Sequence, residues 1–250
     1  MPICYRTAEE IEKLREANQI VAAAHKRLRE ILCPGLTTIE MDREAETVIR
    51  DMGGRPSFKG YRGFPATLCV AINDQVVHGI PDKTRLKEGD IIGLDLGAEY
   101  QGYYGDAART YPVGKVSEPA QKLMDVTREA LYAGIEKMTS GGRLGDVSHA
   151  IQTRAEMEGF SVVTAFVGHG IGTSPHEDPQ VPNFGPPGKG VTLRAGMVLA
   201  IEPMVNEGGA AVEVLKDRWT VRTVDGGLSA HFEHSVAVTE DGYTILSEGV

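Results

Sequence analysis

One segment of the chain recurs 107 residues later, and this repeat constrains the fold more than any other feature. The segment Leu86–Asp95 (LKEGDIIGLD) resembles Leu193–Glu202 (LRAGMVLAIE): a leucine, a basic residue and a glycine lead into an apolar run that ends in an acid. The glycines that follow two long helix-like segments, Gly35 and Gly142, are also 107 residues apart. Two pairs of features with one spacing indicate that a whole structural unit is repeated.

The repeat predicts one domain built from two similar halves. We expect the domain to span residues 1–250, with halves at roughly 8–110 and 115–245 related by approximate two-fold symmetry. A chain of 250 residues is often a single domain. Because each copy of the repeat ends in an acid, each half is expected to give one carboxylate to a central site.

Five residues could together hold two metal ions. Each lies within or at the end of a strand-like segment, where a carboxylate or imidazole is a poor choice for packing and a good one for binding a cation. They are Asp95, Asp106, His169, Glu202 and Glu233. Four carboxylates would balance the charge of two divalent ions. Hydrolases that hold a water between two metals require such a set.

The local patterns predict helices alternating with strands, followed by a strand-rich final third. TAEE at Thr7–Glu10 and TTIE at Thr37–Glu40 have the form of capping boxes that open helices. Further helices are expected near 118–138 and 144–158, strands near 91–97 and 103–110, a hairpin joining 68–73 to 76–80, and a surface loop over 179–190.

Composition narrows the class of protein. The chain has 41% hydrophobic and 24% charged residues, which is ordinary for a globular domain. A net charge of −9 argues against direct binding to nucleic acid or to anionic membranes, because both recruit clustered Lys and Arg. Three cysteines without a CxxC pattern favour a reducing compartment over a disulfide framework. With no signal peptide and no apolar run of about 20 residues, a cytoplasmic protein is expected.

Seven short motifs resemble those of the methionine aminopeptidases. They are NDQVVHGIP around His78, LDLG with Asp95, GYYGD ending at Asp106, GHGIG around His169, PHEDP around His176, IEPM with Glu202 and FEH with Glu233. They extend over about residues 60–240 and are specific only when taken jointly.

The resemblance implies a mixed α/β (α+β) structure, the pita-bread fold. In this fold a pseudo-symmetric, curved antiparallel sheet is backed by helices, which agrees with the 107-residue repeat. The 26 positions from His176 to Glu202 leave no room for the helical insertion of the type II enzymes. The chain therefore resembles the short, bacterial-style type I enzymes.

The resemblance also implies an activity, the hydrolytic removal of the initiator methionine from nascent polypeptides whose second residue is small. Asp95, Asp106 and Glu233 would touch both of two divalent ions (Co²⁺, Mn²⁺, Fe²⁺ or Zn²⁺), while His169 and Glu202 bind one. A hydroxide held between the ions would attack the first peptide bond. His176 would stabilise the developing oxyanion, His78 would contact the scissile nitrogen, and Glu202 would also shuttle a proton.

A pocket for the methionine side chain is expected from the positions that match the family's. These are Tyr61, Phe64, Cys69 and Trp219, with His78 beside them, and they form an apolar, polarisable wall. Phe58 and Pro175 depart from the residues that many bacterial relatives have around this pocket. His231 and His234, which flank Glu233, are predicted to have supporting or structural roles.

Partners and alternatives follow from the same resemblance. The expected partners are the N-termini of nascent chains, with a transient contact to the ribosome, and the expected state is a monomer. One alternative is a proline-directed (X-Pro) aminopeptidase of the same fold. A second is a non-catalytic module that uses this fold to bind peptides or nucleic acid.

Overall fold

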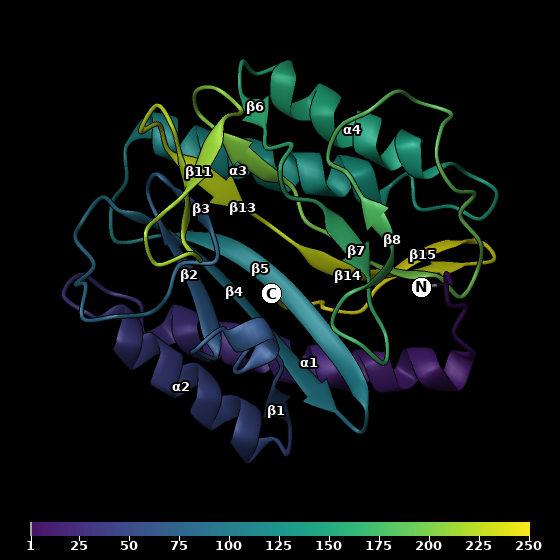
Figure 1. The fold of residues 1–250 in the computed structure, drawn as a ribbon, viewed down its shortest axis with the longest axis horizontal. Coiled ribbons are helices and arrows are strands. Elements are labelled where there is room, and N and C mark those ends of the chain that lie inside the picture. The colour runs from purple at the N-terminus through teal and green to yellow at the C-terminus, as the bar shows by residue number, and fades with distance from the viewer. Residues whose placement is uncertain (1) are drawn as a thin grey trace.

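The fold is taken from a computed structural model, which describes residues 2–250. Helices α1 and α2 lie along one side of the molecule and α3 and α4 along the opposite side, with the strands between them (Figure 1). The helices span Ala8–Ile31 (α1), Thr38–Asp51 (α2), Glu118–Ile135 (α3) and Leu144–Glu156 (α4), and a 3-10 turn covers Tyr61–Gly63. Within these residues, no helix is long and apolar enough to cross a membrane.

Capping explains where the first two helices begin. The Thr7 hydroxyl accepts a hydrogen bond from the Glu10 N–H, and the Glu10 carboxylate accepts one from the Thr7 N–H. Two backbone N–H groups that have no partner within the helix are thereby satisfied. Thr37 and Glu40 form the same reciprocal pair. Both predicted capping boxes are confirmed.

All strand ladders are antiparallel, as the predicted α+β class requires. One sheet contains β1 (Arg55–Pro56), β2 (Leu68–Ile72), β4 (Ile91–Tyr100) and β5 (Tyr103–Pro112). A second has the order β15 (Gly242–Ile245), β14 (His234–Thr239), β9 (Val198–Ile201), β7 (Gly168–Gly170) and β8 (Glu177–Val181). Two smaller sheets join β13 (Ser229–His231), β10 (Met204–Asn206) and β6 (Ser161–Val162), and β11 (Val212–Val214), β12 (Val221–Thr223) and β3 (Gln75–Val77).

The predicted hairpin at residues 68–80 is only partly correct. The chain turns at Asn73, whose φ of 54° is left-handed. Among the described residues the two arms share only an isolated bridge, between Val70 of β2 and Gly79, which lies two residues beyond the end of β3. Strand β3 instead pairs with β12, 144 residues further along from Val77 to Val221. Pairing with a strand so distant in sequence gives no local signal, whereas two short strand-like runs joined at Asn73-Asp74 predict a hairpin.

The predicted loop over 179–190 begins later than expected. Its first three residues, Pro179 to Val181, belong to β8, where Val181 pairs with Gly168 of β7. Strand β8 is at the edge of its sheet, and an edge is where a strand tolerates a proline that cannot donate a hydrogen bond.

Each pair of helices covers its own apolar cluster. Leu28 and Ile49 from α1 and α2 belong to one cluster with Leu94 of β4. Leu131 and Ile151 from α3 and α4 belong to another, which includes residues of β9 and β14. The two-fold relation between the halves stays a prediction, but the repeated order of two helices followed by paired strands matches it.

Helix α1 packs directly on strand β5 behind one of the predicted metal ligands. A Cβ atom at Gly105 would lie 2.6 Å from the Asn18 nitrogen and 2.7 Å from the Ala17 carbonyl carbon. The side chain of Asn18 also accepts a hydrogen bond from the Asp106 N–H at 3.3 Å. The absent side chain at Gly105 therefore lets α1 come close enough for the Asn18 side chain to hold the Asp106 backbone.

Replacing Gly105 with alanine is expected to lower the free energy of unfolding by about 1–3 kcal/mol, since the helix backbone must move to admit the methyl group. Urea unfolding followed by circular dichroism measures the change. Gly209→Ala is the matched control, because a Cβ there meets only the Asp225 carboxylate at an ordinary 3.6 Å. Equal midpoints for the two variants would contradict the close packing.

Candidate metal centre and adjoining pocket

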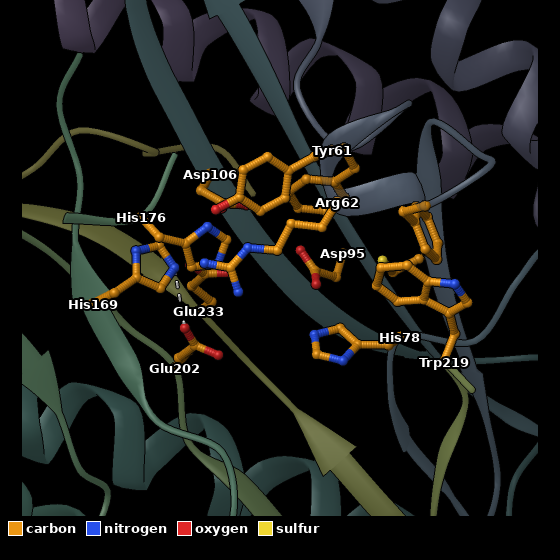
Figure 2. Close-up of a pocket in the computed structure, with 13 residues that line it drawn as sticks. Tyr61, Arg62, His78, Asp95, Asp106, His169, His176, Glu202, Trp219 and Glu233 are labelled. Carbon is orange, nitrogen blue, oxygen red and sulfur yellow. Dashed lines mark ion pairs between the residues drawn. The ribbon is translucent and has the colours of Figure 1, made fainter. Parts of the chain in front are cut away.

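The five residues predicted to bind metal line a single cavity. Asp95 is on β4, Asp106 on β5 and His169 on β7, while Glu202 directly follows β9 and Glu233 directly precedes β14. Figure 2 shows their side chains around a common space. The cavity measures about 140 Å³, and a buried water needs only about 10–15 Å³. The space is therefore large enough for more than a trapped water.

Strand register brings the first two acids together. Asp95 is opposite Ala108 in the β4–β5 ladder, and Asp106 is two residues from Ala108. Residues two apart share a face of the strand, so the two carboxylates are diagonal neighbours on the same face. Gly97, opposite Asp106, has no room for a side chain, because a Cβ there would lie 2.3 Å from the Ser57 hydroxyl oxygen.

The other three candidate ligands come from the second large sheet. His169 is opposite Ala200 in the β7–β9 ladder, and His234 is opposite Ile201 in the β9–β14 ladder. Glu202 and Glu233 are the next residues beyond the Ile201–His234 pair, so the same register places them side by side. An imidazole and two carboxylates therefore lie near one end of β9.

Hydrogen bonds join the two sheets at the site. The Glu233 N–H donates to the Ala108 carbonyl at 2.8 Å, and the Ser235 hydroxyl donates to the Asp106 carbonyl at 2.8 Å. Each bond involves a backbone atom of a candidate ligand, the N–H of Glu233 or the carbonyl of Asp106. These bonds hold the backbones of the two residues in place relative to each other.

Burial raises the pKa of all four acids in the cluster, and repulsion from neighbouring carboxylates raises it further at Asp95, Glu202 and Glu233. Burial first, and then the charge of Asp106, raises the pKa of Asp95 well above its usual range. Burial raises the pKa of Asp106 to about 7. Glu202 and Glu233 also have strongly raised pKa values, from burial and then from the neighbouring carboxylates. Such a cluster disfavours its own ionisation unless a cation is present.

Several oxygens of this cluster have no hydrogen-bond partner among the described residues. They are Asp95 Oδ1, Asp106 Oδ1 and Glu233 Oε1, and all three are buried. Ligand atoms of Asp106, His169 and Glu233 also lie within 4.8 Å of one another. Buried carboxylate oxygens without donors, gathered around an imidazole, fit a divalent cation. Asp95 and Glu202 line the same cavity but lie outside this tightest group.

His169 has the tautomer and the charge that a neutral imidazole needs to bind a metal ion. Its Nδ1–H donates to the Gly170 carbonyl at 2.9 Å, which leaves the Nε2 lone pair directed toward the acids. Burial lowers the pKa of His169 to about 4, so the ring is uncharged at neutral pH. Its Nε2 lies 3.4 Å from Glu202 Oε1 (Figure 2).

Two further histidines face the cavity from opposite sides. His78 has a left-handed backbone with φ of 62°, which is uncommon for a residue with a side chain, and its ring meets Phe166 edge-on at 5.4 Å. His176 is exposed at the mouth, where its ring stacks on Tyr61 at 5.2 Å and lies 4.1 Å from the His169 ring. Burial lowers the pKa of His78, and that of His176 is lowered by desolvation and then by His169.

An apolar wall adjoins the acids. Cys69 is directly opposite Asp95 in the β2–β4 ladder, so the wall begins one strand away from the carboxylates. Phe64 meets the Trp219 ring edge-on at 5.1 Å, and Tyr61 completes the side near His176. Burial raises the pKa of Cys69 well above its usual range, so the thiol stays neutral and packs as an apolar group.

Arg62 had no predicted role, whereas Phe58 was expected near the pocket as a departure from the residues of many bacterial relatives. Phe58 forms part of the wall, and Arg62 enters the cavity from the 3-10 turn, with φ of 50° and its guanidinium 5.2 Å from the Tyr61 ring centroid. The glycines at 60 and 63 were the one sequence signal for this turn. Pro175, which was expected to affect the pocket, directly precedes His176 in the sequence. Its side chain is buried and does not line the cavity.

The histidines on either side of Glu233 differ in surroundings. His231 is buried, with Nε2 3.8 Å from Glu202 Oε2, and burial lowers its pKa to about 3. His234 faces away, where its Nδ1 lies 2.7 Å from the Ser247 hydroxyl. His231 is thus placed to support Glu202, and His234 packs in the interior.

The chain resembles known proteins along nearly its whole length. Residues 12–240 match the model of metallopeptidase family M24. The chain is 53% identical to methionine aminopeptidase 1 of Bacillus subtilis, over 99% of both chains, and 48% identical to methionine aminopeptidase 1 of Mycobacterium tuberculosis, over 98% of this chain and 94% of the relative.

Solved structures give the same grouping. The crystal structure of methionine aminopeptidase from Thermotoga maritima matches with a TM-score of 0.97 at 48% identity, covering 98% of this chain and 99% of the other. Prolidase from Pyrococcus furiosus matches with a TM-score of 0.80 at 23% identity, covering 98% of this chain and 65% of the other. The second likeness concerns the fold alone.

Proposed function

The chain belongs to metallopeptidase family M24 and has its pita-bread fold, and on that premise we propose that it acts as a methionine aminopeptidase. It removes the N-terminal methionine from polypeptides whose second residue is small. One observation carries the proposal: a buried acid cluster with unpartnered oxygens opens directly onto an apolar wall, with Cys69 opposite Asp95. A hydrolytic centre and a side-chain pocket thus adjoin in a single cavity.

The proposed cofactor is a pair of divalent ions, Co²⁺, Mn²⁺, Fe²⁺ or Zn²⁺. Asp95, Asp106 and Glu233 would be shared between them, and His169 and Glu202 would together complete the ligand set of one ion. The four carboxylates then balance the charge of the pair. When bound, the ions supply Lewis acidity and lower the pKa of water toward neutrality.

The other polar residues hold and orient the substrate. The lowered pKa values keep His78 and His176 neutral, so each imidazole can donate one N–H at neutral pH. We assign His176 to the carbonyl oxygen on which negative charge develops, and His78 to the scissile nitrogen. We assign Glu202, which borders the cavity beside His169, to carry a proton to the departing amine.

The apolar wall accounts for the choice of methionine. An unbranched thioether can fill a pocket bounded by Tyr61, Phe64 and Trp219, and each sulfur–aromatic contact contributes about 0.3–1.5 kcal/mol. Phe58 narrows the same pocket with a second buried phenylalanine ring. A polar or charged first residue would lose its hydration there without finding hydrogen bonds.

The two alternatives receive less support. The solved prolidase shares the fold at 23% identity, and this chain covers 65% of its length. A non-catalytic module would have no need for a complete set of five candidate ligands directed into one cavity. Cytoplasmic location, a transient contact with the ribosome and a monomeric state stay predictions.

One assay separates these functions. The purified protein is stripped with chelator and restored with Mn²⁺ or Co²⁺, and release of the first amino acid is timed on Met-Ala-Ser and on Ala-Pro-Ala. We expect metal-dependent release of methionine from the first peptide only. Cleavage of only the second peptide would assign the proline-directed activity. No cleavage of either, with metal bound, would favour the binding module.

A further inference from the structure

The loop between β7 and β8 carries His176 without fixing its ring by hydrogen bonds. Within residues 2–250 the imidazole makes no hydrogen bond or ion pair, and its contacts are the stacked Tyr61 ring at 5.2 Å and the His169 ring at 4.1 Å. Stacking restrains the tilt of a ring but leaves it free to slide. The position of the His176 ring therefore depends on the backbone of the loop.

The side chain of Glu177 fixes that backbone. Its Oε1 accepts hydrogen bonds from the N–H of Thr173 at 2.8 Å and from the N–H of Ser174 at 3.1 Å. The backbone of Glu177 is also in register with Gly170, the residue after His169. One buried carboxylate thus closes the loop and ties it to the strand that carries a proposed metal ligand.

The carboxylate of Glu177 is in turn held by Arg6, 171 positions away in sequence. The Arg6 Nη2 lies 2.6 Å and 2.5 Å from the two Glu177 oxygens, and the side chains are only 8% and 7% exposed. A buried, charge-assisted contact of this kind fixes geometry more strictly than a surface ion pair.

The surroundings of Arg6 are shaped to hold it in place. A Cβ at Gly172 would lie 2.0 Å from Arg6 Nη2, so a residue with a side chain there would displace the guanidinium. The Arg6 N–H donates to the Gly196 carbonyl at 2.7 Å, which anchors the segment before α1 to the turn that leads into β9. The N-terminal arm thus reaches the catalytic loop through one arginine.

We propose that Arg6 and Glu177 are positioning residues for His176, an inference that rests on the proposed function. Neither side chain touches the substrate. Glu177 holds the loop at the spacing that places the His176 imidazole beside the reacting carbonyl, and Arg6 holds Glu177. The N-terminal arm is then part of the catalytic apparatus.

Glu177→Gln tests this directly. The amide oxygen can still accept from Thr173 and Ser174, but the charge that holds Arg6 is lost. Misplacement of a catalytic group by about 1 Å can cost about a hundredfold in rate. We expect kcat on Met-Ala-Ser to fall by about ten- to a hundredfold, with little change in KM, because the apolar wall is unaltered.

A double-mutant cycle with His176→Ala distinguishes positioning from general loosening of the fold. If Glu177 acts through His176, Glu177→Gln costs nothing further once the imidazole is gone. A merely structural role would lower kcat by the same factor in both backgrounds. That result, or an unchanged kcat in the single variant, would overturn the inference.

Further variants keep the test decisive. Arg6→Met removes the guanidinium that holds Glu177, and it enters the same cycle if Glu177→Gln fails to fold by circular dichroism. Arg27→Met is the matched control, since its pair with Glu44 is exposed, and kcat should not change. An inactive wild-type protein would refute the proposed function itself, whereas equal losses in both backgrounds refute the positioning role alone.

Discussion

Asp106→Asn lowers kcat/KM on Met-Ala-Ser by about a thousandfold or more at saturating Mn²⁺, because it removes one charged oxygen donor from the proposed centre. Asparagine has nearly the same shape, and Asp106 contacts Asn18 and Ser235 through backbone atoms that the substitution leaves in place. The fold is therefore expected to persist. Steady-state release of methionine measures the loss, and circular dichroism checks the fold.

The repeat itself supplies the control. Glu213 lies 107 residues after Asp106, in β11, where it is exposed and paired with Arg222 at 2.8 Å. Glu213→Gln also removes one acidic charge, yet it should leave kcat/KM unchanged because the side chain is outside the cavity. Turnover by Asp106→Asn equal to that of this control would remove Asp106 from the metal centre.

Metal binding is expected to stabilise the protein strongly. A ligand that binds only the folded state at a hundred times its Kd adds about 2.7 kcal/mol. Here the ions would also relieve repulsion among the four buried acids, whose raised pKa values reflect the cost of charging them without a cation. Thermal unfolding of the chelator-stripped protein at pH 8, with and without Mn²⁺, measures the gain.

The pH dependence has a definite sign for Asp106. Its folded pKa of about 7 lies above the ordinary value of 3.8, so the folded state binds a proton more tightly than the unfolded state. The resulting stability is complete below pH 3.8 and is lost as the pH rises through about 7. Without metal, Asp106→Asn should therefore gain stability relative to wild type between pH 5 and pH 8, by about a few kcal/mol.

Urea unfolding of the wild type and of Asp106→Asn at pH 5 and pH 8, without metal, measures this change in relative stability. The comparison with Asp106→Asn isolates the contribution of one carboxyl. This is needed because burial lowers the pKa of His25 to about 4, so the stability contributed by such buried histidines rises with pH and opposes that of Asp106. The variant should also gain less from Mn²⁺ than wild type does. Equal stabilisation by metal in the two proteins would exclude Asp106 as a ligand.

The amino-acid sequence was sufficient for the features that depend on near neighbours or on repetition. Both capping boxes follow from residues three positions apart, and the strands predicted near 91–97 and 103–110 are found at 91–100 and 103–112. The five candidate ligands could be chosen because each places an acid or imidazole at a strand position where packing would favour an apolar side chain. Their convergence on one cavity agrees with that choice, and their role as ligands stays a proposal.

Tertiary structure alone decided which distant segments meet. The pairing of β3 with β12, the entry of Arg62 into the cavity and the contact between Arg6 and Glu177 leave no mark in the local sequence. The physical reason is that such contacts depend on strand register and on backbone approach at residues such as Gly172. These are set by the packing of the whole chain, whereas a helix cap or a strand period is set by a few consecutive residues.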